Sequence, residues 1–275
     1  MVQENQAGAR LAMRRMPTVF GPSVGPRQGP DGRSYPSGTA GAQHVTVMSF
    51  MALSEAEPLR RLLPEGVVLS GEPRVHISAS WLEDVGWLAG RGYNVLSVHI
   101  PARVDRALGT VEGEFVAVLW ENLADPIITG REELGMPKIY AEIPAVSRDG
   151  DQVACTAAWD GHIFFEGRIK GLTSDPEGIG KRSSPVTINH KYQPRTGDWG
   201  LADADYITCS APEFTLVTNL ERGQGQVAFR SATWQELPTL AHIVNVLADL
   251  PLEVMDATLA TTKGASDFLG QLIVD

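Results

Sequence analysis

Residues 121–138 read ENLADPIITGREELGMPK and carry the strongest signal in the chain. Asp125-Pro126 and Gly130 predict turns, and Met136-Pro137 places Lys138 at the start of a strand-like segment. The neighbours Met136 and Ile139 are apolar. An apolar setting penalises the charged form of a lysine, so its pKa falls and a neutral, nucleophilic amine becomes available. The pattern therefore nominates Lys138 as a chemically active residue.

The alternative is an ordinary surface lysine. In that interpretation Lys138 begins an exposed strand and pairs with Glu132 or Glu133. Lysines with strongly perturbed pKa values are uncommon, so the residues taken by themselves favour this alternative.

A resemblance changes the balance. The run from Gly130 to Lys138 resembles the signature of the acetoacetate decarboxylase superfamily: Gly-Arg-Glu, a short spacer, an aromatic or apolar residue, Pro and the Schiff-base lysine. Weaker similarity extends over most of residues 44–265, at Glu72-Pro73, Tyr93, Gly113, Glu121-Asn122, Pro185 to Pro194 and Leu250-Pro251. The resemblance implies an α+β, mostly antiparallel β fold, a cone-like β-barrel with peripheral helices, assembled into homo-oligomers.

The sequence also departs from the family pattern. The decarboxylases have a second lysine after the nucleophile, where this chain has Ile139. Two pocket glutamates of the family align with Val95 and Ser78. The family's N-terminal pocket arginine has two candidates, Arg27 and Arg33. This pattern resembles the divergent branch of the superfamily, whose members keep the lysine for aldol, dehydration or cyclisation chemistry.

The resemblance therefore predicts a cofactor-independent lyase that acts on a 2-oxo or 3-oxo acid through a lysine Schiff base, of aldolase–dehydratase or hydratase type. Lys138 is the expected nucleophile, and Glu121 and Glu132 are candidates for proton transfer. The expected substrate-binding residues are Tyr93, Val95, Met136, Arg131 and Trp120. We expect no cofactor and no metal, since the six histidines show no ligand spacing.

Two other functions stay open. Decarboxylation of a 3-oxo acid such as acetoacetate uses the same imine. A non-catalytic protein could keep the barrel and its pocket to bind a small ligand.

Composition bounds the partners and the compartment. The formal net charge of −10 argues against nucleic acid or an anionic membrane as the main partner. The partner that the resemblance implies is a small oxo acid. No stretch approaches the ~18 apolar residues of a membrane span. With only two cysteines and no secretory leader pattern, we expect a cytoplasmic protein.

The chain divides into two predicted parts. Residues 1–43 are expected to form an extended arm, since Pro17 to Gly41 is rich in Pro and Gly, and residues 44–275 a single catalytic domain. A Gly-x-Ser-x-Gly match at Gly21–Gly25 lies in this arm rather than after a buried strand, so it does not indicate a nucleophile elbow.

Most of the domain has strand-like composition. Besides a strand from His44, the predicted strands are Arg74–Trp81, Asn94–Val104, Phe115–Glu121, Ile139–Ile143, Val153–Trp159, His162–Lys170, Tyr206–Cys209, Phe214–Leu220 and Gln226–Thr233. Two helices are predicted, one begun by a capping box at Ser54–Glu57 and one with apolar spacing from Leu237 to Leu247.

Overall fold

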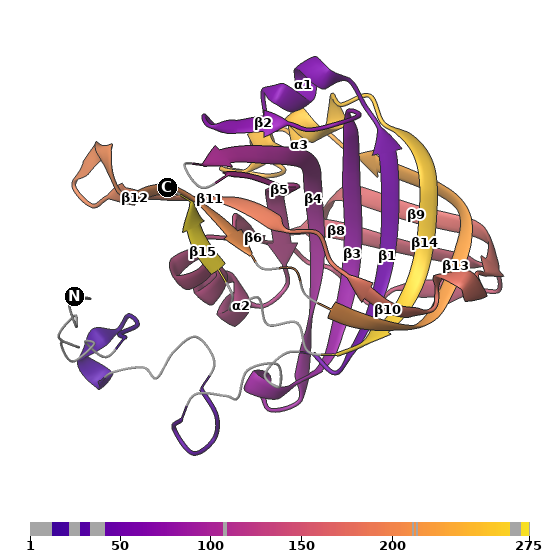
Figure 1. The fold of residues 1–275 in the computed structure, drawn as a ribbon, viewed down its shortest axis with the longest axis horizontal. Coiled ribbons are helices and arrows are strands. Elements are labelled where there is room, and N and C mark those ends of the chain that lie inside the picture. Colours follow the sequence, from indigo (N-terminus) through magenta and orange to yellow (C-terminus); the bar gives the residue numbers. More distant parts are fainter. Residues whose placement is uncertain are drawn as a thin grey trace, which may run out of the picture.

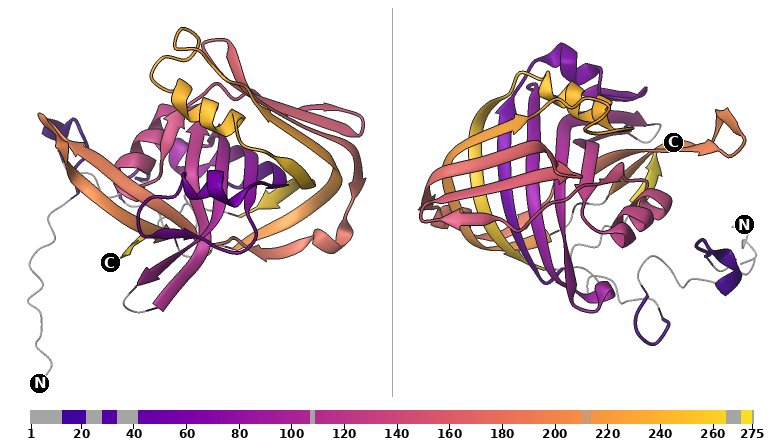
Figure 2. Two further views of the ribbon diagram at one scale, coloured as in Figure 1. Left: turned by 90° about the horizontal axis from the view of Figure 1, so that it is seen from above. Right: turned by 180° about the vertical axis from the view of Figure 1, so that it is seen from behind.

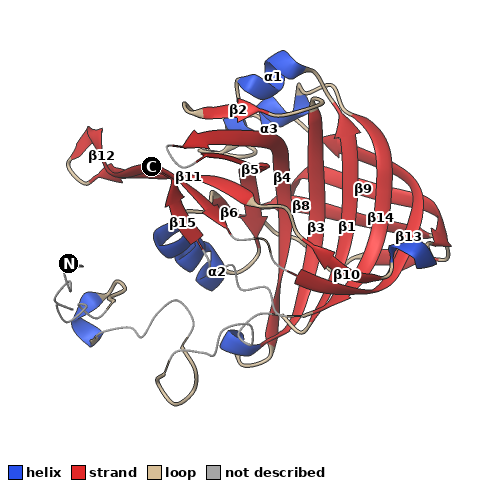
Figure 3. Cartoon of the chain, in the orientation of Figure 1, coloured by secondary structure: helices blue, strands red, loops and turns tan. Residues whose placement is uncertain are grey.

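The computed structural model describes residues 13–21, 28–33, 42–106, 109–210, 212, 214–264 and 271–274. Strands dominate (Figure 3). They are β1 His44–Leu53, β2 Val67–Leu69, β3 Arg74–Val85, β4 Arg91–Arg106, β5 Gly109–Glu121, β6 Lys138–Tyr140, β7 Ser147–Asp149, β8 Gln152–Trp159, β9 His162–Ser174, β10 Gly180–Ser183, β11 Thr187–Arg195, β12 Asp198–Ser210, β13 Phe214–Phe229, β14 Glu253–Lys263 and β15 Gln271–Val274.

The α-helices are short. They are α1 Ala56–Arg60, α2 Ala124–Thr129 and α3 Ala241–Ala248, and a π-helical turn, Gly130–Leu134, continues α2. No helix in the described part of the chain has the length and apolar character that a membrane crossing requires. The predicted capping box is wrong, because α1 has Glu55 as its N-cap and no side-chain cap bond. The predicted turn at Asp125-Pro126 is also wrong: Pro126 lies in the first turn of α2, where its missing N–H leaves no helical bond unmade.

Within the described residues, fifteen strands form one sheet whose main order is β15-β12-β11-β5-β4-β3-β1-β14-β13-β9-β8-β7. The ladders are antiparallel except where β11 and β6 run parallel to β5. The mostly antiparallel class is therefore confirmed. The sheet is strongly curved (Figures 1 and 2), but the described strand order is open, with ends at β15 and β7. The predicted closed barrel is not confirmed.

Alternation along the central strands separates two faces of the sheet. In β4, Leu96, Val98 and Ile100 are fully buried in the main hydrophobic core, which also holds Leu237, Val244 and Leu247 from α3 and the segment before it. Successive side chains of a strand point to opposite sides, so Val95, Ser97 and His99 lie on the other face. We call this second face of β1, β3, β4 and β5 the polar face.

The strand predictions succeed where alternation is clear and fail elsewhere. The predicted strands Phe214–Leu220 and Gln226–Thr233 fall on one strand, β13, which ends at Phe229 rather than Thr233. Its pairing with β9 shifts register between Arg222 and Gln224. Ile139–Ile143 is shorter than predicted, since β6 ends at Tyr140 and Glu142 makes only an isolated bridge to Ala158. The strands that were not predicted are β2, β7, β10, β11, β14 and β15. The extended arm stays a prediction; its described part includes a short 3-10 turn, Thr18–Phe20.

Candidate active site

Lys138 is buried at the first residue of β6. It pairs with Leu119 of β5, and only 5% of the residue is exposed. Leu134 and Met136 on the preceding segment are also buried. The backbone N–H of Leu119 donates to the Pro137 carbonyl oxygen at 3.2 Å, which fixes the segment against β5. The interpretation of Lys138 as an exposed surface lysine is therefore wrong.

The partner of the lysine is Glu121, at the end of β5. The Lys138 Nζ lies 2.7 Å from the Glu121 Oε1, and the two side chains are 6% and 2% exposed. Burial favours the neutral amine, whereas the adjacent carboxylate favours the ammonium ion, so the two influences on the lysine oppose each other. A carboxylate at this distance is also in position to take the ammonium proton.

Gly130 makes room for the lysine side chain. A Cβ at position 130 would lie 2.5 Å from the Cε and 2.9 Å from the Nζ of Lys138. The lysine thus runs across the start of the π-helical turn with no space for a larger residue there. This contact gives a physical reason for the glycine in the Gly-Arg-Glu motif.

Charged residues of the same motif hold the turn in place. The Arg131 Nη1 donates to the Lys138 carbonyl oxygen at 2.9 Å, and Glu133 pairs with Arg15, whose Nη2 lies 3.0 Å from Oε2. Arg15 of the N-terminal segment therefore contacts the π-helical turn that precedes Lys138, and sequence reasoning missed this contact. Of the two predicted arginines, Arg33 is exposed beside Asp31, and Arg27 lies outside the described residues.

The other predicted residues are placed unevenly. Val95 stands opposite Glu121 in the β4–β5 ladder, and Tyr93 precedes it on the same face. Trp120 points the other way, into the core, where its ring centroid lies 5.2 Å from that of Phe164. Glu132 is exposed on the π-helical turn, and its carbonyl oxygen accepts a hydrogen bond from Lys191. The structure does not bring Trp120 to Lys138.

A second polar cluster at the other end of β5 was not predicted. Glu114 accepts from His76 Nδ1 at 3.2 Å and lies 3.5 Å from His99 Nδ1. Ser49 Oγ is 2.8 Å from His76 Nε2, where its hydroxyl donates if Nδ1 carries the imidazole proton. The available signal was the polar residues at every second position of these strands.

Electrostatics set the charges in this cluster. Burial, with a contribution from His76, lowers the pKa of His99 to about 4, although Glu114 acts in the opposite direction. Burial alone would raise the pKa of Glu114, but the hydrogen bond from His76 and the two imidazoles hold it below its ordinary value. At neutral pH the cluster therefore contains an ionised carboxylate and a neutral His99.

The family model described as acetoacetate decarboxylase matches residues 15–268. This chain belongs to the acetoacetate decarboxylase family. The match includes both Glu121 and Lys138. No curated protein gave a significant match.

Several solved structures share the fold of this chain. The acetoacetate decarboxylase of Legionella pneumophila is 17% identical, with a TM-score of 0.68 and 88% of this chain and 89% of that chain covered. An acetoacetate decarboxylase-like enzyme from Sphingomonas wittichii is 19% identical, with a TM-score of 0.64 and 84% and 92% covered. The enduracididine biosynthesis enzyme MppR, complexed with the condensation product of pyruvate and imidazole 4-carboxaldehyde, is 14% identical, with a TM-score of 0.58 and 84% and 88% covered.

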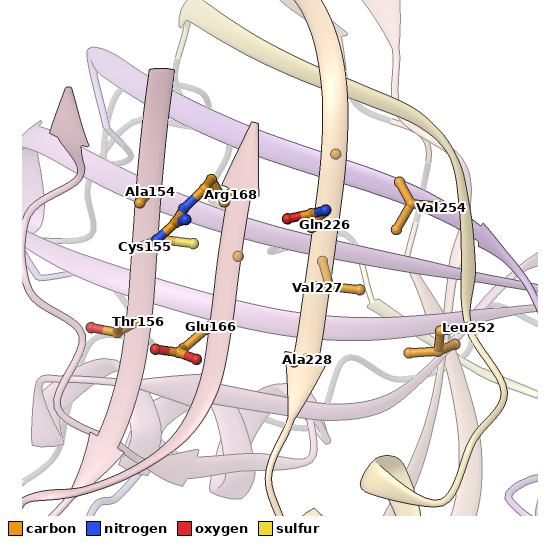
Figure 4. A pocket seen from close by; sticks show the side chains of 12 residues that line it. Ala154, Cys155, Thr156, Glu166, Arg168, Gln226, Val227, Ala228, Leu252 and Val254 are labelled. Carbon is orange, nitrogen blue, oxygen red and sulfur yellow. The ribbon is translucent and has the colours of Figure 1, made fainter. Parts of the chain in front are cut away.

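Two cavities lie away from the polar face of this family member. One of about 350 Å³ backs β6 and is lined by Pro137, Ile139 and apolar residues of α3. Another, of about 560 Å³, lies among β8, β9, β13 and the start of β14 (Figure 4), where Glu166, Arg168 and Gln226 project from neighbouring strands. Neither is lined by Lys138, so the candidate chemistry does not coincide with them.

Proposed function

We propose that Lys138 forms a Schiff base with the ketone of a 2-oxo or 3-oxo acid, and that the protein is a lyase of aldolase–dehydratase or hydratase type. The observation that carries the proposal is the buried pair of the Lys138 Nζ and the Glu121 Oε1, 2.7 Å apart. An amine nucleophile needs a group that removes its proton, and Glu121 is in hydrogen-bond contact with it.

The chemistry follows from that pair. Glu121 accepts the ammonium proton, the free amine adds to the ketone carbon, and the carbonyl oxygen leaves as water. The resulting protonated imine accepts electrons from the neighbouring carbon, so loss of a proton there gives an enamine. The enamine carbon then attacks an aldehyde, and elimination of water gives an unsaturated imine. Hydrolysis of this imine by water releases the unsaturated oxo acid and regenerates the Lys138 amine.

The surroundings of the lysine favour this outcome over decarboxylation. Val95 is apolar and stands opposite Glu121, while Ser78 hydrogen-bonds Ser97 at 2.9 Å, so neither supplies a carboxylate. Ile139 lines the cavity behind β6. A lysine at position 139 would therefore point into that cavity, on the opposite side of β6 from Lys138. The MppR complex adds support, because a protein of the same fold holds a pyruvate–aldehyde condensation product.

Decarboxylation of a 3-oxo acid is the second candidate. The family match supports it, and loss of carbon dioxide from the imine would give the same enamine. The two candidates differ in product: acetoacetate gives acetone, whereas pyruvate with an aldehyde gives an unsaturated oxo acid. We expect condensation to exceed acetone release; rapid acetone release without condensation would assign decarboxylation instead.

The imine itself is tested by reductive trapping. Borohydride with pyruvate should add one adduct to the peptide that contains Lys138, as measured by mass spectrometry. Lys138→Ala should abolish the adduct, while Lys170→Ala, an exposed lysine on β9, should leave it unchanged. A non-catalytic binding protein would give no adduct, and labelling that survives Lys138→Ala would contradict the proposal.

A further inference from the structure

Asn189 and Thr208 carry buried polar atoms that lack partners. Asn189 is 0% exposed and Thr208 5% exposed. Among the described residues, both amide atoms of Asn189 and the Thr208 hydroxyl have no hydrogen-bond partner. A buried polar group without a partner destabilises the fold, so such groups in a native protein call for an explanation, and a missing ligand is one.

The two residues face each other across the β11–β12 ladder, where Asn189 is the register partner of Thr208. The next pair on the same face, Thr187 and Ser210, satisfies itself, since their hydroxyl oxygens are 2.7 Å apart. The lack of partners is therefore local to one position of the ladder. It is not a general property of this pair of strands.

This position lies beside the catalytic segment. The Thr208 Oγ1 is 3.3 Å from the point that a Cβ on Gly135 would occupy, so its hydroxyl meets the residue that ends the π-helical turn before Met136. β11 pairs with β5 up to Phe115, and β6 pairs with the same edge of β5 from Leu119. Asn189 thus stands where β11 leaves the edge that β6 joins, roughly 10 Å along it from Lys138.

The local charge suits an anion. Lys191 follows on the same face of β11, and its Nζ donates to the Glu132 carbonyl oxygen at 2.7 Å and lies 6.0 Å from the Tyr206 ring centroid. Neither of these partners carries a negative charge. In a protein with a net charge of −10, a cation placed this way supplies the positive potential that an anionic substrate requires.

We propose that Asn189 and Thr208 bind the carboxylate of the oxo acid whose ketone reacts with Lys138. The Asn189 amide and the Thr208 hydroxyl donate hydrogen bonds to its oxygens, and Lys191 adds a favourable field. The inference rests on the proposed function and specifies its substrate class: a keto acid is captured, and a neutral ketone of the same size is not favoured.

The test compares two ketones that differ only in the carboxylate. Borohydride labelling of Lys138 is measured against the concentration of pyruvate and of acetone for the wild type, Asn189→Leu, the near-isosteric Thr208→Val, and Ser210→Ala as the neighbouring control. Loss of one hydrogen bond to a charged group should raise the half-saturating pyruvate concentration roughly tenfold or more in the first two variants. Acetone labelling, and both ketones with Ser210→Ala, should stay close to wild type.

Stability separates this role from a structural one. Asn189→Leu removes an unsatisfied polar group, so its Tm should hold or rise while pyruvate capture falls. Equal labelling of the variants and the wild type at every pyruvate concentration, or an equal loss with both ketones, would overturn the inference while leaving the imine intact. If no ketone labels the wild type, the proposed function fails and the inference fails with it.

Discussion

Two buried or half-buried glutamates on β5 provide an internal comparison. Glu121, at the end of the strand, pairs with an aliphatic amine in a setting where the two side chains are 6% and 2% exposed. Glu114, seven positions earlier, is 16% exposed and contacts two imidazoles. Two glutamates on one face of one strand thus have different partners and different exposure to solvent. The partner's chemistry and the access of water decide what each carboxylate can do.

The largest expected effect comes from breaking the Glu121 pair. Glu121→Leu leaves the Lys138 ammonium buried without its carboxylate, which should cost about 3–5 kcal/mol of unfolding free energy. The double variant Glu121→Leu/Lys138→Met should recover most of this loss. Glu114→Gln should cost only about 1 kcal/mol, because its partners can stay neutral and keep a hydrogen bond. Urea denaturation measures all three, and equal losses at the two glutamates would remove the contrast.

The second effect is a pH dependence of the free energy of unfolding, caused by the cluster around Glu114. The pKa of His99 is lowered from 6.5 to about 4 in the fold, so between these values the unfolded chain binds a proton that the folded protein does not. Stability should therefore fall as pH decreases from 6.5 to 4, by at most about 3 kcal/mol. Glu114, whose pKa is also lowered, acts in the same direction below pH 4.5, and His76 is the other group that faces this pair.

Unfolding at pH 7 and pH 5 isolates this contribution. His99→Gln should reduce the loss of stability between the two pH values, whereas His242→Gln, on the exposed side of α3, should leave it unchanged. An unaltered slope in His99→Gln would show that His99 does not titrate as its burial requires.

The third effect tests whether the position of the Lys138 side chain beside Glu121 depends on Gly130. Gly130→Ala places a methyl group where the Lys138 side chain lies, 2.5 Å from its Cε, so the buried lysine must move away from Glu121. Overpacking of this kind costs about 1–3 kcal/mol, and the rate of borohydride labelling at Lys138 should fall with it. Gly200→Ala is the control, since its nearest neighbour would be 3.9 Å away. Undiminished labelling in Gly130→Ala would mean that the lysine has another path.

A comparison of β3 with β14 shows which strands the sequence could predict. The alternation of Val75, Ile77 and Ala79 predicts β3 and its buried face, because the period of a strand is written in consecutive residues. In β14 the buried positions Ala257 and Leu259 are set among Asp256, Thr258 and Thr261, which gives a weaker signal. The regular alternation of apolar and polar residues was enough to predict β3. The sequence of β14 lacks so clear an alternation, and its composition did not predict a strand.

The site divides in the same way. Lys138 and Glu121 were predicted from one contiguous segment, since the motif contains the candidate nucleophile and its neighbours in sequence. The pairing of Asn189 with Thr208, and of Ser49 with His76, depends on strands that meet only in the folded sheet. The local sequence around these residues does not fix the register of the strands, so these pairings could not be predicted from the sequence of one strand.

The smallest expected effect concerns Ser49. Its hydroxyl, His76 and Glu114 stand in the order of a nucleophile, a base and a carboxylate, at 2.8 and 3.2 Å. Acyl transfer also needs N–H groups that stabilise an oxyanion, and Ser49 lies in ladders with both β3 and β14, whose backbone donors are engaged. Ser49→Ala should therefore cost only about 1 kcal/mol of stability, the worth of its hydrogen bond, and leave imine trapping at Lys138 unchanged. A fluorophosphonate probe should not label Ser49 in the wild type. Labelling that disappears in Ser49→Ala would instead make the Glu114 end a second reactive centre, and the contrast between the two glutamates would become one between two nucleophiles.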